Sequence, residues 1–165
     1  CLSLFNMTTA IIKAKKADKK RKVLKGKFEV VGDEKRVRWL EEKFGKHCVR
    51  FEQTVLALAR QLASEYQGGY WEFMEVKEGV VFEEECGQEG AVFLGLKGNE
   101  EFEISNQNSQ SMTKMDGFGF GLYITFLAVN DLMWKFQGEE KFITYYHALK
   151  NVIIDYDIEL YSLID

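Results

Sequence analysis

The stretch YQGGYWEF, residues 66–73, stands where the periodicity of this chain changes. Upstream, residues 50–66 repeat apolar side chains at helical spacing, whereas residues 70–76 alternate as a strand does. A phosphate-binding glycine loop runs the other way, from strand to helix, because the helix N-terminus holds the phosphate. We therefore predict that Gly68 and Gly69 join a helix to a strand, with a left-handed glycine closing the helix.

Strand-like segments follow this joint in quick succession. A short turn at residues 77–79 predicts a hairpin between residues 70–76 and 80–84. A second turn at residues 97–100 predicts a hairpin between residues 91–96 and 101–105. Together the two hairpins predict one small antiparallel sheet of about four strands.

About four helices are predicted to pack with this sheet. The first begins after Asp33, ends at Gly45 and directs Val37, Leu40 and Phe44 inward. The second is the helix that precedes the joint. The third and fourth span about residues 112–136 and 139–156. The predicted fold class is α+β, with one domain over residues 28–165.

The third predicted helix contains three glycines, each of which costs a helix up to ~1 kcal/mol relative to alanine. Small residues at Gly117, Gly121 and Ala128 share one side of that helix. This stripe predicts that another element packs closely against it. The alternative is that DGFGFG, residues 116–121, forms a flexible ligand-binding loop.

Charge divides the chain into a basic arm and an acidic body. Residues 1–27 hold nine Lys/Arg and one Asp, a net charge of +8, whereas the remaining residues hold 13 basic and 25 acidic side chains, a net charge of −12. The arm is either a solvated tail or a salt-sensitive contact for nucleic acid. The basic residues for such a contact are Lys13, Lys15, Lys16, Lys19, Lys20, Arg21 and Lys22.

Composition predicts a soluble cytoplasmic protein. The three cysteines form no CxxC pair, which fits a reducing compartment. The uncharged stretch of 14 residues from Gly117 to Asn130 is shorter than the ~20 that span a bilayer. Met7 resembles an initiator, so residues 1–6 are expected to precede the native start.

No catalytic, cofactor or metal site is predicted. The chain has two histidines, His47 and His147, and lacks HExxH, GxSxG and Gly-rich strand-to-helix motifs. Cys48 beside His47 raises the alternative of a thiol hydrolase, although adjacent side chains rarely face each other. The acidic residues of the 83–89 and 100–103 segments could bind a divalent metal, but strand ends and a negative surface explain them more simply.

The order of these features resembles the ArdB/KlcA family of antirestriction proteins. The family's Y-x-G-G-x-W-x-F run is matched here at Tyr66, Gly68, Gly69, Trp71 and Phe73. Its small-residue-rich helix is similar to GFGFGLYITFLAVNDLMW, which includes Asn130 and Trp134, and its Y-H-x-L-R segment resembles the chain around His147. The hairpin after the joint departs from the family, because KEGVVFEEE has neither its paired glycines nor its proline.

The resemblance implies a non-enzymatic protein of a phage, plasmid or other mobile element. Such a protein inhibits type I restriction of incoming DNA in the host bacterial cell by binding a protein complex. Inhibition of another defence nuclease, such as a CRISPR system, and a nucleic-acid-binding accessory role of the arm are the alternatives. Partial DNA mimicry by the acidic hairpins also stays open as a mechanism.

Exposed polar residues near the motif are the candidates for partner binding. They are Glu72, Glu75, Glu83, Glu84, Asp116 and Asn130. The aromatic motif residues Tyr66, Trp71, Phe73 and Trp134 are expected in the core, and His147 is expected to be a structural histidine. Their substitution should therefore affect stability before function.

Overall fold

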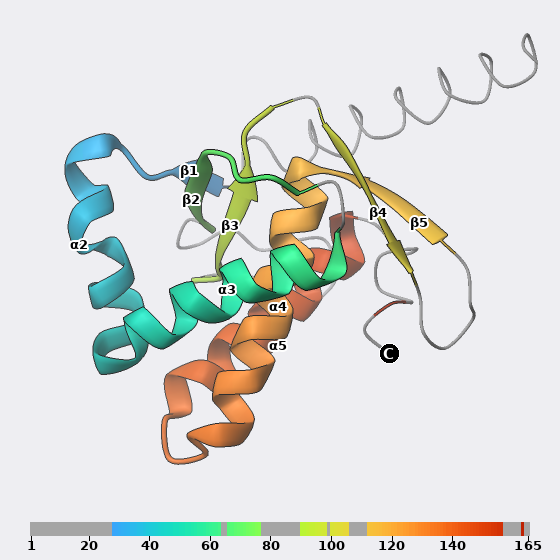
Figure 1. Cartoon of the computed structure of the whole chain (residues 1–165). Coiled ribbons are helices and arrows are strands. Elements are labelled where there is room, and N and C mark those ends of the chain that lie inside the picture. The colour runs from blue at the N-terminus through green and yellow to red at the C-terminus, as the bar shows by residue number, and fades with distance from the viewer. Residues whose placement is uncertain are drawn as a thin grey trace, which may run out of the picture.

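The computed structural model describes residues 28–63, 66–76, 90–98, 100–105, 112–156 and 163 (Figure 1). Over these residues the chain forms four α-helices, one short 3-10 helix and five strands, which confirms the α+β class. The elements are, in chain order, β1 (Phe28–Val30), α2 (Asp33–Phe44), η1 (Gly45–His47), α3 (Cys48–Leu62), β2 (Trp71–Val76), β3 (Val92–Leu96), β4 (Glu101–Ser105), β5 (Met112–Asp116), α4 (Gly117–Lys135) and α5 (Glu140–Tyr156). The basic arm and the segment 80–84 lie outside the described residues.

The described strands form two antiparallel sheets, so the prediction of one four-stranded sheet is wrong. β1, β2 and β3 make a three-stranded sheet in that order, and β4 pairs with β5 in a separate ribbon. The predicted hairpin between residues 91–96 and 101–105 does not form, because β3 pairs with β2 instead. All five residues of β3 are buried, which suits a strand covered on both faces rather than a half-exposed hairpin.

The β4–β5 ribbon replaces the start of the predicted third helix. Residues 112–116 form a strand, and Phe102 pairs with Met115 while Glu103 pairs with Lys114. This register places apolar side chains on the buried face and joins Glu103 to Lys114 by an ion pair of 3.4 Å. Helix α4 therefore begins at Gly117.

The N-terminus of α4 is capped by Asp116. The Asp116 carboxylate accepts hydrogen bonds from the Gly119 amide at 2.9 Å and from the Tyr156 hydroxyl at 3.1 Å. The segment DGFGFG is thus a cap followed by a buried helical turn, and the flexible-loop alternative is wrong. None of the described helices is long and apolar enough to cross a membrane.

Helix α4 runs along the outer edge of β3 (Figure 1). Lys97 N–H donates to the Tyr70 carbonyl and the Ala91 carbonyl accepts from Val76 N–H, so the odd-numbered residues of β3 bond to β2. By the alternation of an antiparallel pair, the peptide groups of Leu94 and Leu96 point away from β2. The helix covers them and closes an edge that could otherwise pair with another chain.

The predicted small-residue stripe makes this contact. A Cβ on Gly117 would lie 2.3 Å from the Leu96 carbonyl oxygen, and a Cβ on Gly121 would lie 2.2 Å from that of Leu94. Helix and strand backbones therefore touch at both glycines. The prediction that another element packs closely against the stripe is confirmed.

Thr125 completes the edge contact one turn further along α4. Its hydroxyl accepts from Leu94 N–H at 3.0 Å and donates to the Gly121 carbonyl at 2.7 Å, and the residue is fully buried.

Thr125→Val leaves the Leu94 N–H buried without a partner. We expect a loss of about 2 kcal/mol in the free energy of unfolding, measured by urea denaturation. Thr125→Ser keeps the hydroxyl, and an equal loss in both variants would contradict the hydrogen-bond explanation.

Helix α2 turns only part of the predicted face inward, with Leu40 half-buried against the core. Val37 is 87% exposed, whereas Trp39 is buried and stacks on Phe73 with ring centroids 4.9 Å apart. Arg36 and Lys43 flank Trp39 along the same stripe, and their long stems cover apolar surface while their charged ends stay polar. The larger aromatic side chain decides the rotation of the helix, and Phe44 remains inside as predicted.

The joint that connects α3 to β2 is longer than predicted. Helix α3 ends at Leu62, with Ala63 in an extended conformation at its C-cap. Gly68 has a φ of 100°, but it lies in the segment before β2 and does not close the helix. The helix-to-strand direction of the joint is confirmed, and the left-handed glycine belongs to the entry into β2.

Candidate functional site

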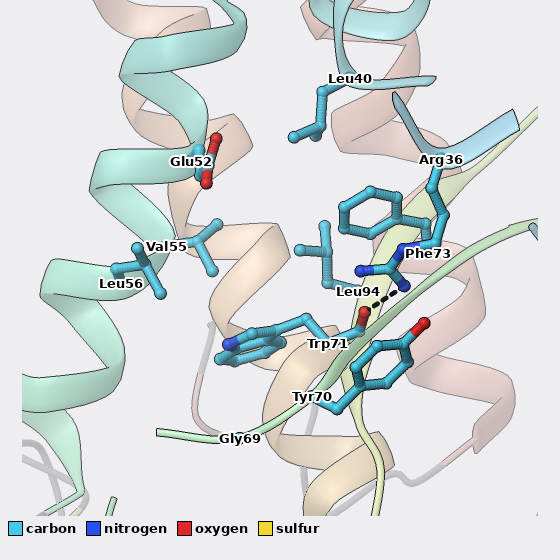
Figure 2. Close-up of a pocket in the computed structure, with 10 residues that line it drawn as sticks. All are labelled: Arg36, Leu40, Glu52, Val55, Leu56, Gly69, Tyr70, Trp71, Phe73 and Leu94. Atoms are coloured by element: carbon cyan, nitrogen blue, oxygen red, sulfur yellow. Dashed lines mark hydrogen bonds between the residues drawn. The ribbon is translucent and has the colours of Figure 1, made fainter. Parts of the chain in front are cut away.

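A half-open pocket lies beside the double glycine, between α2, α3 and the first residues of β2 (Figure 2). Its volume is ≈ 190 Å³, and it opens to solvent on one side. The lining residues are Arg36, Leu40, Glu52, Val55, Leu56, Gly69, Tyr70, Trp71, Phe73 and Leu94. The motif stretch that marks the change of periodicity thus forms one wall.

Arg36 is the fixed cation of this pocket. Its guanidinium lies between the rings of Tyr70 and Phe73, 4.5 Å and 4.3 Å from their centroids, and its Nη1 donates to the Trp71 carbonyl at 2.6 Å. Figure 2 shows a further nitrogen of the guanidinium facing the pocket. The planar cation is therefore held in one orientation with donors to spare.

The aromatic motif residues build the wall and hold it in place. The Trp71 indole N–H donates to the Tyr66 hydroxyl at 3.1 Å, and the Trp71 ring lies 6.4 Å from Phe120 of α4. Phe73 is buried against Trp39. The expectation that Tyr66, Trp71 and Phe73 belong to the packed interior is confirmed, with Tyr66 and Trp71 half-buried at its margin.

Glycine at position 69 keeps the wall close to β3. A Cβ there would lie 2.8 Å from the Leu96 Cδ2 atom, at the flexible end of that side chain. Tyr70 follows at the rim, 50% exposed, and its hydroxyl lies 3.4 Å from the Asp33 carboxylate. The double glycine therefore serves both the left-handed turn at Gly68 and close packing at Gly69.

The predicted partner-binding residues lie on different elements. Glu72 and Glu75 are half-buried on β2, Asp116 caps α4, and Asn130 is half-buried further along α4. Glu83 and Glu84 lie outside the described residues. None of the four described side chains is among the lining residues of the pocket, and the role of all six residues in partner binding stays a prediction.

Glu75 belongs to a network that links α2, β2 and α5. Its carboxylate forms an ion pair with Lys43 at 2.9 Å and lies 3.4 Å from the Trp39 indole nitrogen. The Tyr145 hydroxyl of α5 donates to the Lys43 carbonyl at 2.9 Å. Burial opposes the charge on Lys43, but the hydrogen bond and attraction of Glu75 outweigh it and raise the pKa of Lys43.

Removing the Glu75 charge should therefore weaken the fold in a pH-dependent way. Glu75→Gln is expected to lower the free energy of unfolding by about 1 kcal/mol at neutral pH, because both side chains are partly exposed. The pKa of Lys43 is higher in the folded protein than its ordinary value of 10.5. The ion pair therefore stabilises the fold fully below pH 10.5, and this stabilisation is lost as the pH rises through the folded pKa of Lys43. Urea denaturation at pH 7 and pH 12 measures it, with Glu72→Gln as the matched control on the same strand. A difference unchanged at pH 12 would contradict the ion-pair explanation.

Trp134 is not a core residue, contrary to expectation, and His147, which was expected to be a structural histidine, lies at the surface. Trp134 is 66% exposed near the end of α4, and His147 is exposed on α5, where its ring meets that of Tyr146 edge-on. Both helices bury the faces turned towards each other and the sheet, and these two side chains lie off those faces.

Trp134→Ala should consequently leave stability nearly unchanged. We expect a change of less than about 0.5 kcal/mol in the free energy of unfolding, measured by urea denaturation. Trp71→Ala removes a half-buried ring and its hydrogen bond to Tyr66, and it should cost several times more. Similar losses in both variants would contradict the surface placement of Trp134.

His47 is packed among aromatic rings. Its imidazole is nine-tenths buried, stacks on Phe136 with centroids 3.9 Å apart, and lies 3.7 Å through Nε2 from the Glu139 carboxylate. It ties η1 to the turn between α4 and α5. Cys48, at the start of α3, packs half-buried against the core.

Sequence reasoning missed the two charged residues of the pocket, Arg36 and Glu52. Arg36 sits at i−3 and i−4 from Trp39 and Leu40, so a cation within an apolar helical stripe was the available signal. Glu52 stands among exposed residues of α3, and nothing in its surroundings distinguishes it from other surface acids.

Comparison with known proteins supports the fold. No family model matches the sequence, and no curated protein matches it. A solved structure described as that of the KlcA and ArdB proteins, with a novel fold and antirestriction activity against type I DNA restriction systems in vivo but not in vitro, matches with a TM-score of 0.67 at 21% sequence identity. The match covers 84% of this chain and 94% of that chain, so this chain has a KlcA/ArdB-like fold.

Proposed function

We propose that this protein is an anti-defence protein that protects incoming DNA from type I restriction by binding a host protein complex. The main observation in support of this proposal is the fold shared with the KlcA and ArdB structure over 84% of this chain. The Y-x-G-G-x-W-x-F run supports the proposal, because its aromatic residues and glycines shape a pocket at the surface.

The proposed action is stoichiometric binding without catalysis. The described residues that line the pocket include one guanidinium and one carboxylate, and neither a histidine nor a thiol is among these described residues. His47 is engaged with Phe136 and Phe142 inside the protein. This inventory suits recognition of a partner surface better than covalent chemistry. In this proposal the protein comes from a phage or plasmid and acts in the host bacterial cytoplasm.

The test is phage plating on cells that carry an active type I restriction system, with and without expression of this protein. The assay belongs in cells, because the activity described for the KlcA and ArdB proteins was seen in vivo but not in vitro. We expect unmodified phage to plate with raised efficiency on expressing cells. Methylation of the host DNA is followed in parallel and is expected to stay intact.

One control and one variant are measured alongside in this assay. Modified phage should plate equally with and without the protein, and a folded Trp134→Ala variant reports whether that exposed aromatic contributes to protection. No rescue by soluble, folded protein would overturn the type I assignment. The same plating assay on cells with other defence nucleases, including a CRISPR system, then tests the alternative target.

A further inference from the structure

We propose that the pocket beside the double glycine receives an acidic side chain, together with a neighbouring apolar residue, from the partner protein. This inference rests on the proposed function, because it names the chemistry of the partner segment. The pocket joins a fixed guanidinium to apolar walls, and an aspartate or glutamate beside an apolar residue complements both.

The guanidinium is prepared for a carboxylate. Among the residues that the structure describes, Arg36 forms no ion pair, and its guanidinium donates a hydrogen bond to the Trp71 carbonyl. The rings of Tyr70 and Phe73 clamp its plane, so little side-chain entropy remains to be lost on binding. An incoming carboxylate would form a charge-assisted hydrogen bond with the donors that face the pocket.

The remaining walls select an apolar neighbour. Val55 and Leu56 of α3 face the indole of Trp71 across the pocket, and Leu94 lies at its base (Figure 2). Rigid aromatic and aliphatic walls around one charged donor resemble the buried centre of a protein interface more than its polar rim.

Glu52 sets the strength of this attraction. Its carboxylate lies on the α3 side of the same pocket and repels the negative charge of an incoming carboxylate. Glu52 is exposed, so its replacement should not disturb folding. Removing its charge should therefore strengthen carboxylate binding, an effect that loss of structure cannot produce.

The first test uses three probes of similar shape and different charge: 3-phenylpropanoate, 3-phenylpropanamide and 3-phenylpropylamine. Each is titrated into ¹⁵N-labelled protein while the indole N–H resonance of Trp71 is followed. We expect the carboxylate to bind at least tenfold more tightly than the amide, and the amine to bind most weakly. Equal affinities, or preference for the amine, would overturn the proposal.

Variants assign this preference to the pocket. Arg36→Gln should abolish the difference between carboxylate and amide, and Glu52→Gln should tighten carboxylate binding severalfold. Glu41→Gln removes an exposed acid of α2 that does not line the pocket, and it should change nothing. Arg36 packs between the rings of Tyr70 and Phe73, so Arg36→Gln can also unfold the protein. In that case the tighter carboxylate binding expected of Glu52→Gln is the result that tests the proposal. No gain in that variant would overturn the proposal.

The second test asks whether the pocket meets the partner in cells. Leu56→Trp fills the pocket from the half-buried wall of α3, and it should abolish probe binding and reduce phage protection at least tenfold. Protection undiminished by a folded, filled pocket would overturn the docking inference and leave the proposed function standing. Absence of protection by the wild type would instead overturn the proposed function, while the probe series still decides the charge preference.

Discussion

Gly121→Ala is expected to lower the free energy of unfolding by about 3 kcal/mol, although alanine favours helices by up to ~1 kcal/mol over glycine. The added Cβ would lie 2.2 Å from the Leu94 carbonyl oxygen and 2.6 Å from the Gly95 Cα. Both atoms are backbone of strand β3, so neither can turn aside as a side chain would. Helix and strand must separate, and the hydrogen bond between Thr125 and Leu94 is strained with them.

Urea and thermal denaturation measure this loss. For a chain of this length ~3 kcal/mol corresponds to roughly 6–12 °C in melting temperature. Gly138→Ala is the matched control, because a Cβ there meets nothing within 4 Å in the turn between α4 and α5. A stabilised Gly121→Ala protein would mean that α4 does not rest on the edge of β3.

Phe44→Ala is expected to cost about 4 kcal/mol. Phe44 is fully buried and stacks on Phe51 with ring centroids 3.8 Å apart, and it also meets Phe142 and Tyr145 of α5. The ring lies where α2, α3 and α5 converge, so its removal leaves a cavity that no single element can fill. A loss of this size is a large share of the 5–15 kcal/mol of a typical domain.

A matched pair on the same helix isolates the effect of burial. Val37→Ala changes a side chain that is 87% exposed and should alter stability by less than about 0.5 kcal/mol. Phe44→Leu keeps most of the apolar volume and should fall between the two. Comparable losses for Val37→Ala and Phe44→Ala would mean that α2 turns a different face to the core.

These stability predictions also decide which variants can report on function. Phe44 and Gly121 hold the interior, so loss of phage protection on their substitution would follow from unfolding. Glu52 and Trp134 are exposed, so a change of protection there would report a contact with the partner. Assays of the proposed function therefore rest on the second group.

The sequence alone determined those features that depend on neighbouring residues. The change from helical to strand periodicity at residues 66–73 identified the joint, because each period reflects the local backbone. The spacing of Gly117 and Gly121 predicted a close contact, since a helix carries such glycines at a cost that packing offsets. The end of α2 at Gly45 and the start of α5 near Glu140 also followed from local capping and charge signals. The predicted start of α2 after Asp33 was wrong, because Asp33 is the first residue of the helix and Gly32 is its N-cap, without a side-chain hydrogen bond.

Only the tertiary structure decided which strands pair, which face of α2 is buried and where the pocket lies. Alternating side chains do not identify a strand's partner, so β3 was assigned to β4 although it pairs with β2. Trp39 outweighs Val37 in α2 because Phe73 provides a ring to stack on, and that ring comes from a distant part of the chain. The pocket unites Arg36, Glu52 and Trp71 from three elements. Their proximity arises from packing between segments, a property that local sequence patterns do not contain.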